Sequence, residues 1–237
     1  MNHERIDREM GRKKSYSNRV WGCLFLLLAP LLVGWEFLGF ASYAWHQKMT
    51  VEVEVEGERY SGSSVVAMSV FRHSDFPLVH GNLDFGVEGE AVVVPLPDKR
   101  QLFALLTYNA GLAVKAFSDV MSLKDRQSSE KWAIVTAQKE EVRELAPKDY
   151  PLLVTFTDIN DPTTVKQVDP HNLAATFGPG VELKRITLEI TDEPVTEGKI
   201  EKVLGWWNNL TVPIGGKVDR KYGEPLYGIG KWSFVRR

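Results

Sequence analysis

Strictly alternating apolar and charged residues mark the start of the part of the chain that is expected to fold. Residues 50–56 read Thr-Val-Glu-Val-Glu-Val-Glu, which is the period-two pattern of a β-strand with one buried and one solvated face. A second apolar run, residues 64–71, follows a turn expected at Ser61 and Gly62. The sequence therefore predicts a β-hairpin, and its glutamates suit a solvated strand face better than a cation site.

Further β-strands are predicted from short apolar runs and from a second alternating stretch. These strands are expected at residues 91–94, 132–137, 151–157, 181–191 and 232–235. Residues 101–108 are apolar enough for either a buried strand or a short helix. Within 181–191 the alternation is interrupted at Arg185 and Ile186. Strand-forming segments thus extend over most of the chain beyond residue 50.

Fewer helices are predicted, and they are recognised mainly from the capping and terminating residues at their ends. They are expected at residues 115–123, 138–145, 170–177 and 196–204. Pro147 ends the second, which has paired charges, and Gly178 ends the third, which starts at Asp169-Pro170. Thr196 is the expected N-cap of the last. Because strands outnumber helices and do not alternate regularly with them, the predicted fold class is α+β: one mainly antiparallel, β-rich domain over residues 46–237.

Residues 20–45 form a long apolar stretch with Glu36 as its single charged residue. As a helix rising about 1.5 Å per residue, the stretch exceeds the roughly 30 Å of hydrocarbon in a bilayer. Trp21 and Trp45 lie near its two ends, where aromatic rings favour the headgroup level. We therefore expect one transmembrane anchor helix over residues 20–45, kinked at Pro30.

Charged residues on the two sides of this stretch predict its orientation. Residues 1–19 carry six arginines and lysines, whereas glutamates dominate the segment that follows residue 45. The positive-inside rule places the basic tail, residues 1–19, in the cytoplasm and residues 46–237 outside it. A cleaved signal peptide is the alternative, because Ser42 and Ala44 are small residues at the two positions that signal peptidase reads.

Composition limits the chemistry of the outer domain. The single cysteine, Cys23, lies in the apolar stretch, so residues 46–237 have no disulfide, thiol nucleophile or thiolate metal site. A domain without disulfides outside the cytoplasm suits a bacterial envelope. The formal net charge of −2 gives no indication of a nucleic-acid partner.

A search for catalytic residues yields one combination. Serines at 61, 63 and 64 precede His73, Asp75 and His80, so a serine–histidine–aspartate set can be composed from them. Such triads are defined by geometry, and the glycine–serine–glycine elbow of many hydrolases is missing. Chance proximity is the better explanation, and we assign no catalytic residue and no cofactor.

Asp158, Asn160 and Asp161 are the candidate metal ligands. Their carboxylate and amide oxygens are of the kind that Ca²⁺ prefers. No glycine supports an EF-hand type of loop here, and Asp169 stands where such a loop has its last glutamate. We favour the alternative that Asp158 and Asp161 accept hydrogen bonds from turn amides after a buried strand.

Aromatic residues are frequent near the C-terminal end. They are Trp206, Trp207, Tyr222, Tyr227, Trp232 and Phe234. Tryptophan and tyrosine are enriched at binding hot spots, but the same residues can instead pack the last segment onto the core. We favour packing for each residue taken singly.

Several segments together resemble a family of uncharacterised bacterial membrane-anchored proteins. They are the Val-Glu hairpin with Tyr60–Val65, Val154–Pro162, Val168–Val181 and the threonine-led helix before Trp206. The resemblance covers most of the outer domain. It implies membrane anchoring and brings no known activity or site residues.

These observations predict a non-catalytic binding or accessory domain of the bacterial envelope. We expect it in the inner (plasma) membrane, with a cytoplasmic N-terminus and a periplasmic C-terminal domain. Its expected partners are the lipid bilayer, through residues 20–45, and an envelope protein of unknown identity. The alternative is a membrane-tethered hydrolase that acts on an envelope substrate and uses His73 or His80.

Overall fold

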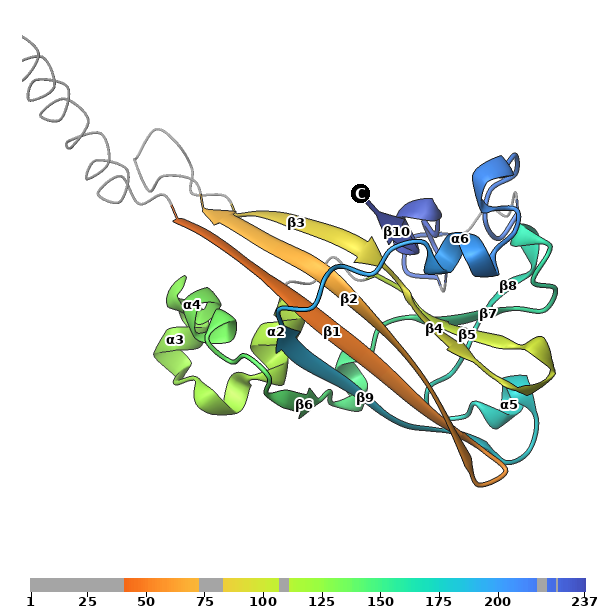
Figure 1. Cartoon of the computed structure of the whole chain (residues 1–237), viewed down its shortest axis with the longest axis horizontal. Helices are drawn as coiled ribbons and strands as arrows, with labels where there is room; N and C mark the ends of the chain where they lie inside the picture. The colour runs from red at the N-terminus through yellow and green to blue at the C-terminus, as the bar shows by residue number, and fades with distance from the viewer. Residues whose placement is uncertain (1–40, 73–82, 107–110, 217–220, 225) are drawn as a thin grey trace, which may run out of the picture. The chain divides into compact units, whose positions relative to one another are not determined.

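A computed structural model describes residues 41–72, 83–106, 111–216, 221–224 and 226–237 (Figure 1). Contacts divide the chain into two compact units, one of residues 1–42 with 71–84 and one of residues 43–70 with 85–237. Of the first unit only the ends of three strands are described. The hydrophobic core lies in the second unit. His73, Asp75 and His80 lie outside the described residues.

The strands β1 (Ala41–Val55) and β2 (Glu58–Arg72) are neighbours in one sheet and form a long hairpin (Figure 1). Its turn is made by Glu56 and Gly57, which have positive φ angles of 51° and 90°. Positive φ at both central residues is what a tight hairpin turn of the right twist requires. The expected hairpin is confirmed, but the turn expected at Ser61 and Gly62 is wrong, because both residues lie within β2.

The start of β1 corrects the C-terminal boundary expected for the anchor helix. Residues 41–45 are strand, whereas residues 20–40 lie outside the described residues. Trp45, expected at the headgroup level, is only 6% exposed and stacks on Trp132 with the ring centroids 5.9 Å apart. Within the described ranges, no helix has the length and apolarity needed to cross a bilayer.

The first sheet has six strands in the order β10-β3-β2-β1-β9-β6. The four further strands are β3 (Leu83–Glu90), β6 (Val142–Glu144), β9 (Val181–Thr191) and β10 (Val235–Arg236). β9 is antiparallel to β1, β6 to β9 and β10 to β3. The pairing of β1 with β9 therefore joins segments far apart in the sequence.

β9 contains a bulge that explains the interruption in its apolar pattern. Glu52 pairs with Arg185 and Val53 with Leu183, which leaves Lys184 as an extra residue. Because the extra residue resets the alternation, Leu183 and Ile186 both pack on the core although they are three residues apart. The strand expected at 181–191 is confirmed.

The second sheet has four strands in the order β4-β5-β7-β8, each antiparallel to its neighbour. They are β4 (Val92–Pro95), β5 (Gln101–Ala104), β7 (Leu153–Phe156) and β8 (Val165–Gln167). Only Ala91 separates β3 from β4, so the chain passes directly from one sheet into the other. The strands expected at 91–94 and 151–157 are confirmed, and the segment from residue 101 starts as a strand.

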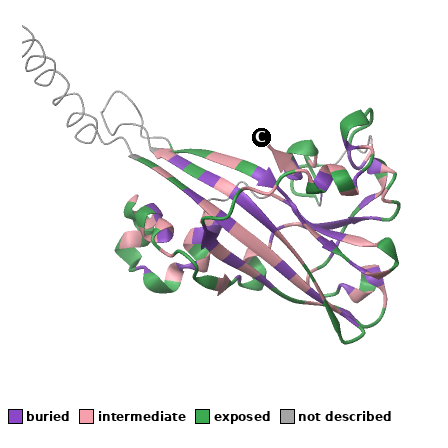
Figure 2. Cartoon of the chain, viewed as in Figure 1, coloured by how far each residue is buried: buried purple, intermediate pink, exposed green. Residues whose placement is uncertain are grey.

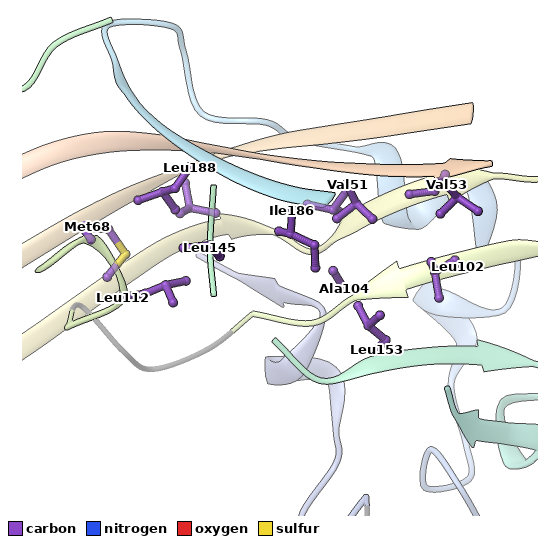
Figure 3. Close-up of a cluster of buried hydrophobic side chains, with 14 of the residues drawn as sticks. Val51, Val53, Met68, Leu102, Ala104, Leu112, Leu145, Leu153, Ile186 and Leu188 are labelled. Carbon is purple, nitrogen blue, oxygen red and sulfur yellow. The ribbon is translucent and has the colours of Figure 1, made fainter. Parts of the chain in front are cut away.

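The core fills the space between the two sheets. Figure 3 shows Val51 and Ile186 of the first sheet facing Ala104 and Leu153 of the second. Buried and partly buried residues alternate along β1 and β2 in Figure 2, as expected for strands with one face on the core. The second sheet is also covered on its other face, where Phe103 belongs to a second buried cluster. Burial on both faces explains the nearly continuous apolar runs of β5 and β7.

The helices are short. They are α2 (Gly111–Ala116), α3 (Leu123–Gln127), α4 (Glu130–Thr136), α5 (Ala174–Phe177) and α6 (Lys199–Val203). Single 3₁₀ turns lie at Pro97–Lys99, Ser118–Val120, Pro147–Asp149, Pro162–Thr164, Trp207–Asn209 and Lys231–Ser233. The described part of the chain is therefore mainly antiparallel β-sheet with few helices, as α+β predicts.

Two adjacent segments have the opposite structure to the one expected. Residues 132–137, expected as a strand, lie mostly in α4, because Trp132 and Val135 are one helical turn apart and both are buried. Residues 138–145, expected as a helix, contain β6, which pairs with the edge of β9. Val142 pairs opposite Glu189 and stays 54% exposed. Edge pairing with β9 overrides the helical propensity of this segment.

Three other expected boundaries are shifted. α5 begins at Ala174 rather than after Pro170, although Gly178 ends it with a φ angle of 98°, as expected. The helix expected over 115–123 ends at residue 116 and is followed by a 3₁₀ turn. The last strand is limited to Val235–Arg236.

Candidate functional site

An open groove of about 650 Å³ is lined by residues of β1, β2, β4, β5 and α6. Ser61 and Ser63 of β2, Thr50 of β1 and Gln101 of β5 supply its uncharged polar residues. Val93 of β4 contributes an apolar wall. The groove is thus built by both sheets and one helix, and it combines hydroxyl, amide and aliphatic groups.

Three lysines line this groove, which we call the lysine groove. Lys48 comes from β1, and Lys199 and Lys202 are one helical turn apart on α6, so they share a face of the helix. The Lys199 ammonium donates a hydrogen bond to the main-chain oxygen of Ser63, at 2.9 Å. No carboxylate lines the groove among the residues that the structure describes. The lining is therefore positively charged.

One acidic residue moderates this charge from outside the lining. Lys48 donates to the Glu193 carboxylate at 2.6 Å, and this hydrogen bond raises the pKa of Lys48 above its ordinary value. Lys202 forms no ion pair within the described residues. The positive charge of the lysine groove is consequently strongest along α6.

A buried carboxylate holds α6 in place. Glu90, the last residue of β3, is 1% exposed, and its two carboxylate oxygens accept hydrogen bonds from the main-chain N–H groups of Gly198, Lys199 and Ile200. These are the N–H groups that the start of a helix leaves without a partner inside the helix. Glu90 therefore caps α6, and the N-cap expected at Thr196 is wrong.

Thr196 instead ties the segment before α6 to β2. Its main-chain N–H donates to the oxygen of Val65, and its hydroxyl accepts from the N–H of Val65, both at 2.9 Å. The Ser64 hydroxyl donates to the main-chain oxygen of Glu90 at 2.6 Å. Strand β2, the end of β3 and the start of α6 are thereby joined directly beside the lysine groove.

A second cleft, of about 500 Å³, is lined by His46, Ser69 and Asp192 among other residues. His46 Nδ1 lies 2.7 Å from the main-chain oxygen of Glu193, so Nδ1 carries the proton and donates it there. Both Asp192 carboxylate oxygens accept from Lys139 at 2.8 Å. The main-chain oxygen of Glu193 thus occupies the Nδ1 position that the aspartate of a serine–histidine–aspartate triad would take, and no carboxylate from the described residues bonds this ring.

The aspartates considered as metal ligands accept hydrogen bonds from residues of the turn in which they lie. Asp158 Oδ1 accepts from the main-chain N–H of Asn160 at 2.9 Å, and Asp161 Oδ1 accepts from the N–H and hydroxyl of Thr163 at 2.8 and 2.7 Å. Asp161 is the N-cap of a 3₁₀ turn. In the described ranges, no three histidine, cysteine, aspartate or glutamate side chains gather as metal ligands would. The geometry supports the turn interpretation.

Replacing Thr163 with alanine is expected to raise the pKa of Asp161 towards its ordinary value. The Thr163 hydroxyl and N–H hold this pKa low by donating to the charged carboxylate, and the variant keeps only the N–H. A carboxyl ¹³C NMR titration of the full chain measures the change. Ca²⁺ at millimolar concentration should leave the Asp161 signal in place, and a specific shift would instead support a metal site.

The glutamates of β1 face solvent and pair across the strands. Glu52 binds Arg185 at 2.7 Å, and Glu54 binds Lys184 at 3.5 Å. These cross-strand ion pairs agree with a solvated strand face.

Trp206 is partly buried and packs against the second buried cluster. The other five C-terminal aromatic residues divide into two groups. Trp207 and Phe234 are buried and pack together, with ring centroids 6.1 Å apart. Tyr222, Tyr227 and Trp232 are exposed, and the Tyr222 side chain is the most open at 91%. The interpretation that these residues pack onto the core is confirmed for the first group. The residues of the second group lie on the surface.

Sequence reasoning did not find the lysine groove. Lys48 lies just before the first alternating stretch, and Lys199 and Lys202 lie about 150 residues later, so only the fold brings them together. The spacing of Lys199 and Lys202 on one face of a predicted helix was the available signal. No protein-family model, curated protein or solved structure matches the chain.

Proposed function

We propose that the chain is a membrane-anchored, non-catalytic binding or accessory protein of the bacterial envelope. Its basic N-terminal tail lies in the cytoplasm, residues 20–40 contain the anchor in the inner (plasma) membrane, and the domain that follows lies in the periplasm. The resemblance to uncharacterised bacterial membrane-anchored proteins agrees with this placement. The lysine groove is the ligand site.

The observation that carries the proposal is the lining of the lysine groove. It combines lysines, hydroxyl-bearing residues and an amide, and it has no carboxylate among the described residues to act as a general base or acid. Hydroxyl, amide and ammonium groups that converge in a groove are suited to hold a polar ligand. A hydrolase draws no support from the second cleft, because Asp192 bonds Lys139 and His46 Nδ1 bonds a main-chain oxygen rather than a carboxylate of the described part of the chain.

Site-specific cross-linking in living cells tests the binding function. A photoreactive amino acid at Ser61, in the lysine groove, should form adducts with an envelope component, whereas the same amino acid at Lys166, an exposed residue of β8, should not. Equal adducts at both positions would contradict a dedicated site. Turnover of envelope esters, peptides or glycans by the pure chain, abolished by His73→Ala or His80→Ala, would establish the hydrolase instead.

Thiol labelling tests the orientation. In cells with a permeabilised outer membrane, an impermeant maleimide should label Asn208→Cys, because this residue is exposed in the outer domain. Ser15→Cys, in the basic tail, should react only after lysis. Both variants are made in a Cys23→Ser chain so that each has one thiol. Labelling of Ser15→Cys alone in intact cells would reverse the proposed orientation.

A further inference from the structure

We propose that the lysine groove binds the anionic group of a sugar, either a sugar carboxylate or a sugar phosphate. This inference rests on the proposed function, because it names the ligand class for the same groove. The shared chemistry is a negative charge surrounded by hydroxyl groups.

The lysines of the groove imply that its ligand is negatively charged. Three lysines from two elements line one groove, and within the described ranges only Lys48 has a carboxylate partner, Glu193, which lies outside the lining. Lys199 uses one of its donors on the main chain of Ser63 and keeps the others. Lys202 has no ion pair among the described residues. An anion between Lys199 and Lys202 would receive charge-assisted hydrogen bonds from both.

The uncharged polar residues of the groove suit the hydroxyl groups of a ligand. Ser61 and Ser63, which bear hydroxyl groups, and Gln101, which bears a side-chain amide, line it. Sugar hydroxyls are donors and acceptors at once, so they can pair with hydroxyl and amide groups of this kind.

The start of α6 does not supply the anion site. Its free N–H groups already donate to the Glu90 carboxylate, on the side where α6 meets β3. The lysine side chains are consequently the cationic groups left for a ligand, and their removal is the direct test.

Isothermal titration of the full chain in mild detergent at low ionic strength tests the inference. Three probes are compared: tri-galacturonate, which carries carboxylates, mannose 6-phosphate, which carries a phosphate, and neutral maltotriose. We expect one or both acidic probes to bind, to weaken as NaCl is added, and to exceed maltotriose in affinity. The acidic probe that binds more tightly identifies the source of the negative charge.

Variants locate the binding. Lys202→Gln should lower the affinity for the acidic probe by about tenfold, because a neutral hydrogen bond replaces a charge-assisted one. Lys202→Glu should lower it further, because the new carboxylate repels the anion. Lys166→Gln removes the same charge from an exposed position outside the groove and should leave the affinity unchanged. An unchanged melting temperature shows that each variant is folded.

Two results would overturn the inference. In the first, Lys202→Glu binds the acidic probe as tightly as the natural chain does. In the second, maltotriose binds as well as the acidic probes, or neither acidic probe binds at all. With cross-links still formed at position 61, either result leaves a binding groove for a ligand of another class. The proposed function fails separately, if the cross-links at position 61 are lost or form equally at position 166.

Discussion

Replacing Glu90 with alanine is expected to destabilise the fold by about 3 to 5 kcal/mol, the cost of removing one partner from a buried charged network. The carboxylate accepts three main-chain hydrogen bonds at the start of α6 and is almost completely buried. Without it, the buried N–H of Ile200 and the partly buried N–H groups of Gly198 and Lys199 lose their acceptor. Because a domain is stable by only about 5 to 15 kcal/mol, the loss is a large fraction of the total.

Urea denaturation of the full chain, followed by tryptophan fluorescence, measures this effect. Glu88→Ala is the matched control, because Glu88 lies two residues earlier on the same strand and is exposed. The control should stay within about 0.5 kcal/mol of the natural chain. Equal stabilities of the Glu90 and Glu88 variants would contradict the role of Glu90 as the cap of α6.

Replacing Gly62 with alanine is expected to destabilise the fold by at least about 2 kcal/mol, as for other insertions into a closely packed site. A Cβ atom at this position would lie 2.0 Å from the main-chain oxygen of Val93 and 2.7 Å from its carbonyl carbon. Both are backbone atoms, so no side chain can turn away. Strands β2 and β4 must then move apart, at the point where they form the wall of the lysine groove.

Gly205→Ala tests whether the added methyl group itself matters. A Cβ atom there meets no atom within 4 Å, and the glycine is exposed. Thermal unfolding should show a melting temperature close to that of the natural chain for Gly205→Ala and a clear decrease for Gly62→Ala. Similar melting temperatures for the two variants would mean that β2 and β4 separate at little cost.

The strands that sequence patterns predict well are those with one or two buried faces. The alternation in β1 and β9 was readable because the pleat exposes every second side chain, and even the interruption at Arg185 and Ile186 corresponds to the bulge at Lys184. β7 was recognised for a different reason, because burial on both faces leaves a continuous apolar run. Burial on one face or on both thus leaves a distinct pattern in the sequence.

Features that depend on a partner elsewhere in the chain could not be predicted from the sequence. Residues 138–145 have helical propensity, but the open edge of β9 recruits them as β6. Glu90 looked like one more charged residue, because the N–H groups that it satisfies lie more than a hundred residues away. The lysine groove likewise requires β1 and α6 to meet. Tertiary contacts decide these cases, and local patterns do not encode them.

The ion pairs of β1 have a consequence for biosynthesis. A nascent chain emerges N-terminus first, so the hairpin of β1 and β2 exists well before β9 has been synthesised. During that interval one edge of β1 is unpaired, and open edges invite association with other chains. Glu52 and Glu54 are then uncompensated, since Arg185 and Lys184 arrive only with β9. The like charges of Glu52 and Glu54 on different nascent chains repel each other, which opposes association of their hairpins. When β9 pairs with β1, it covers the open edge and its Arg185 and Lys184 neutralise these charges.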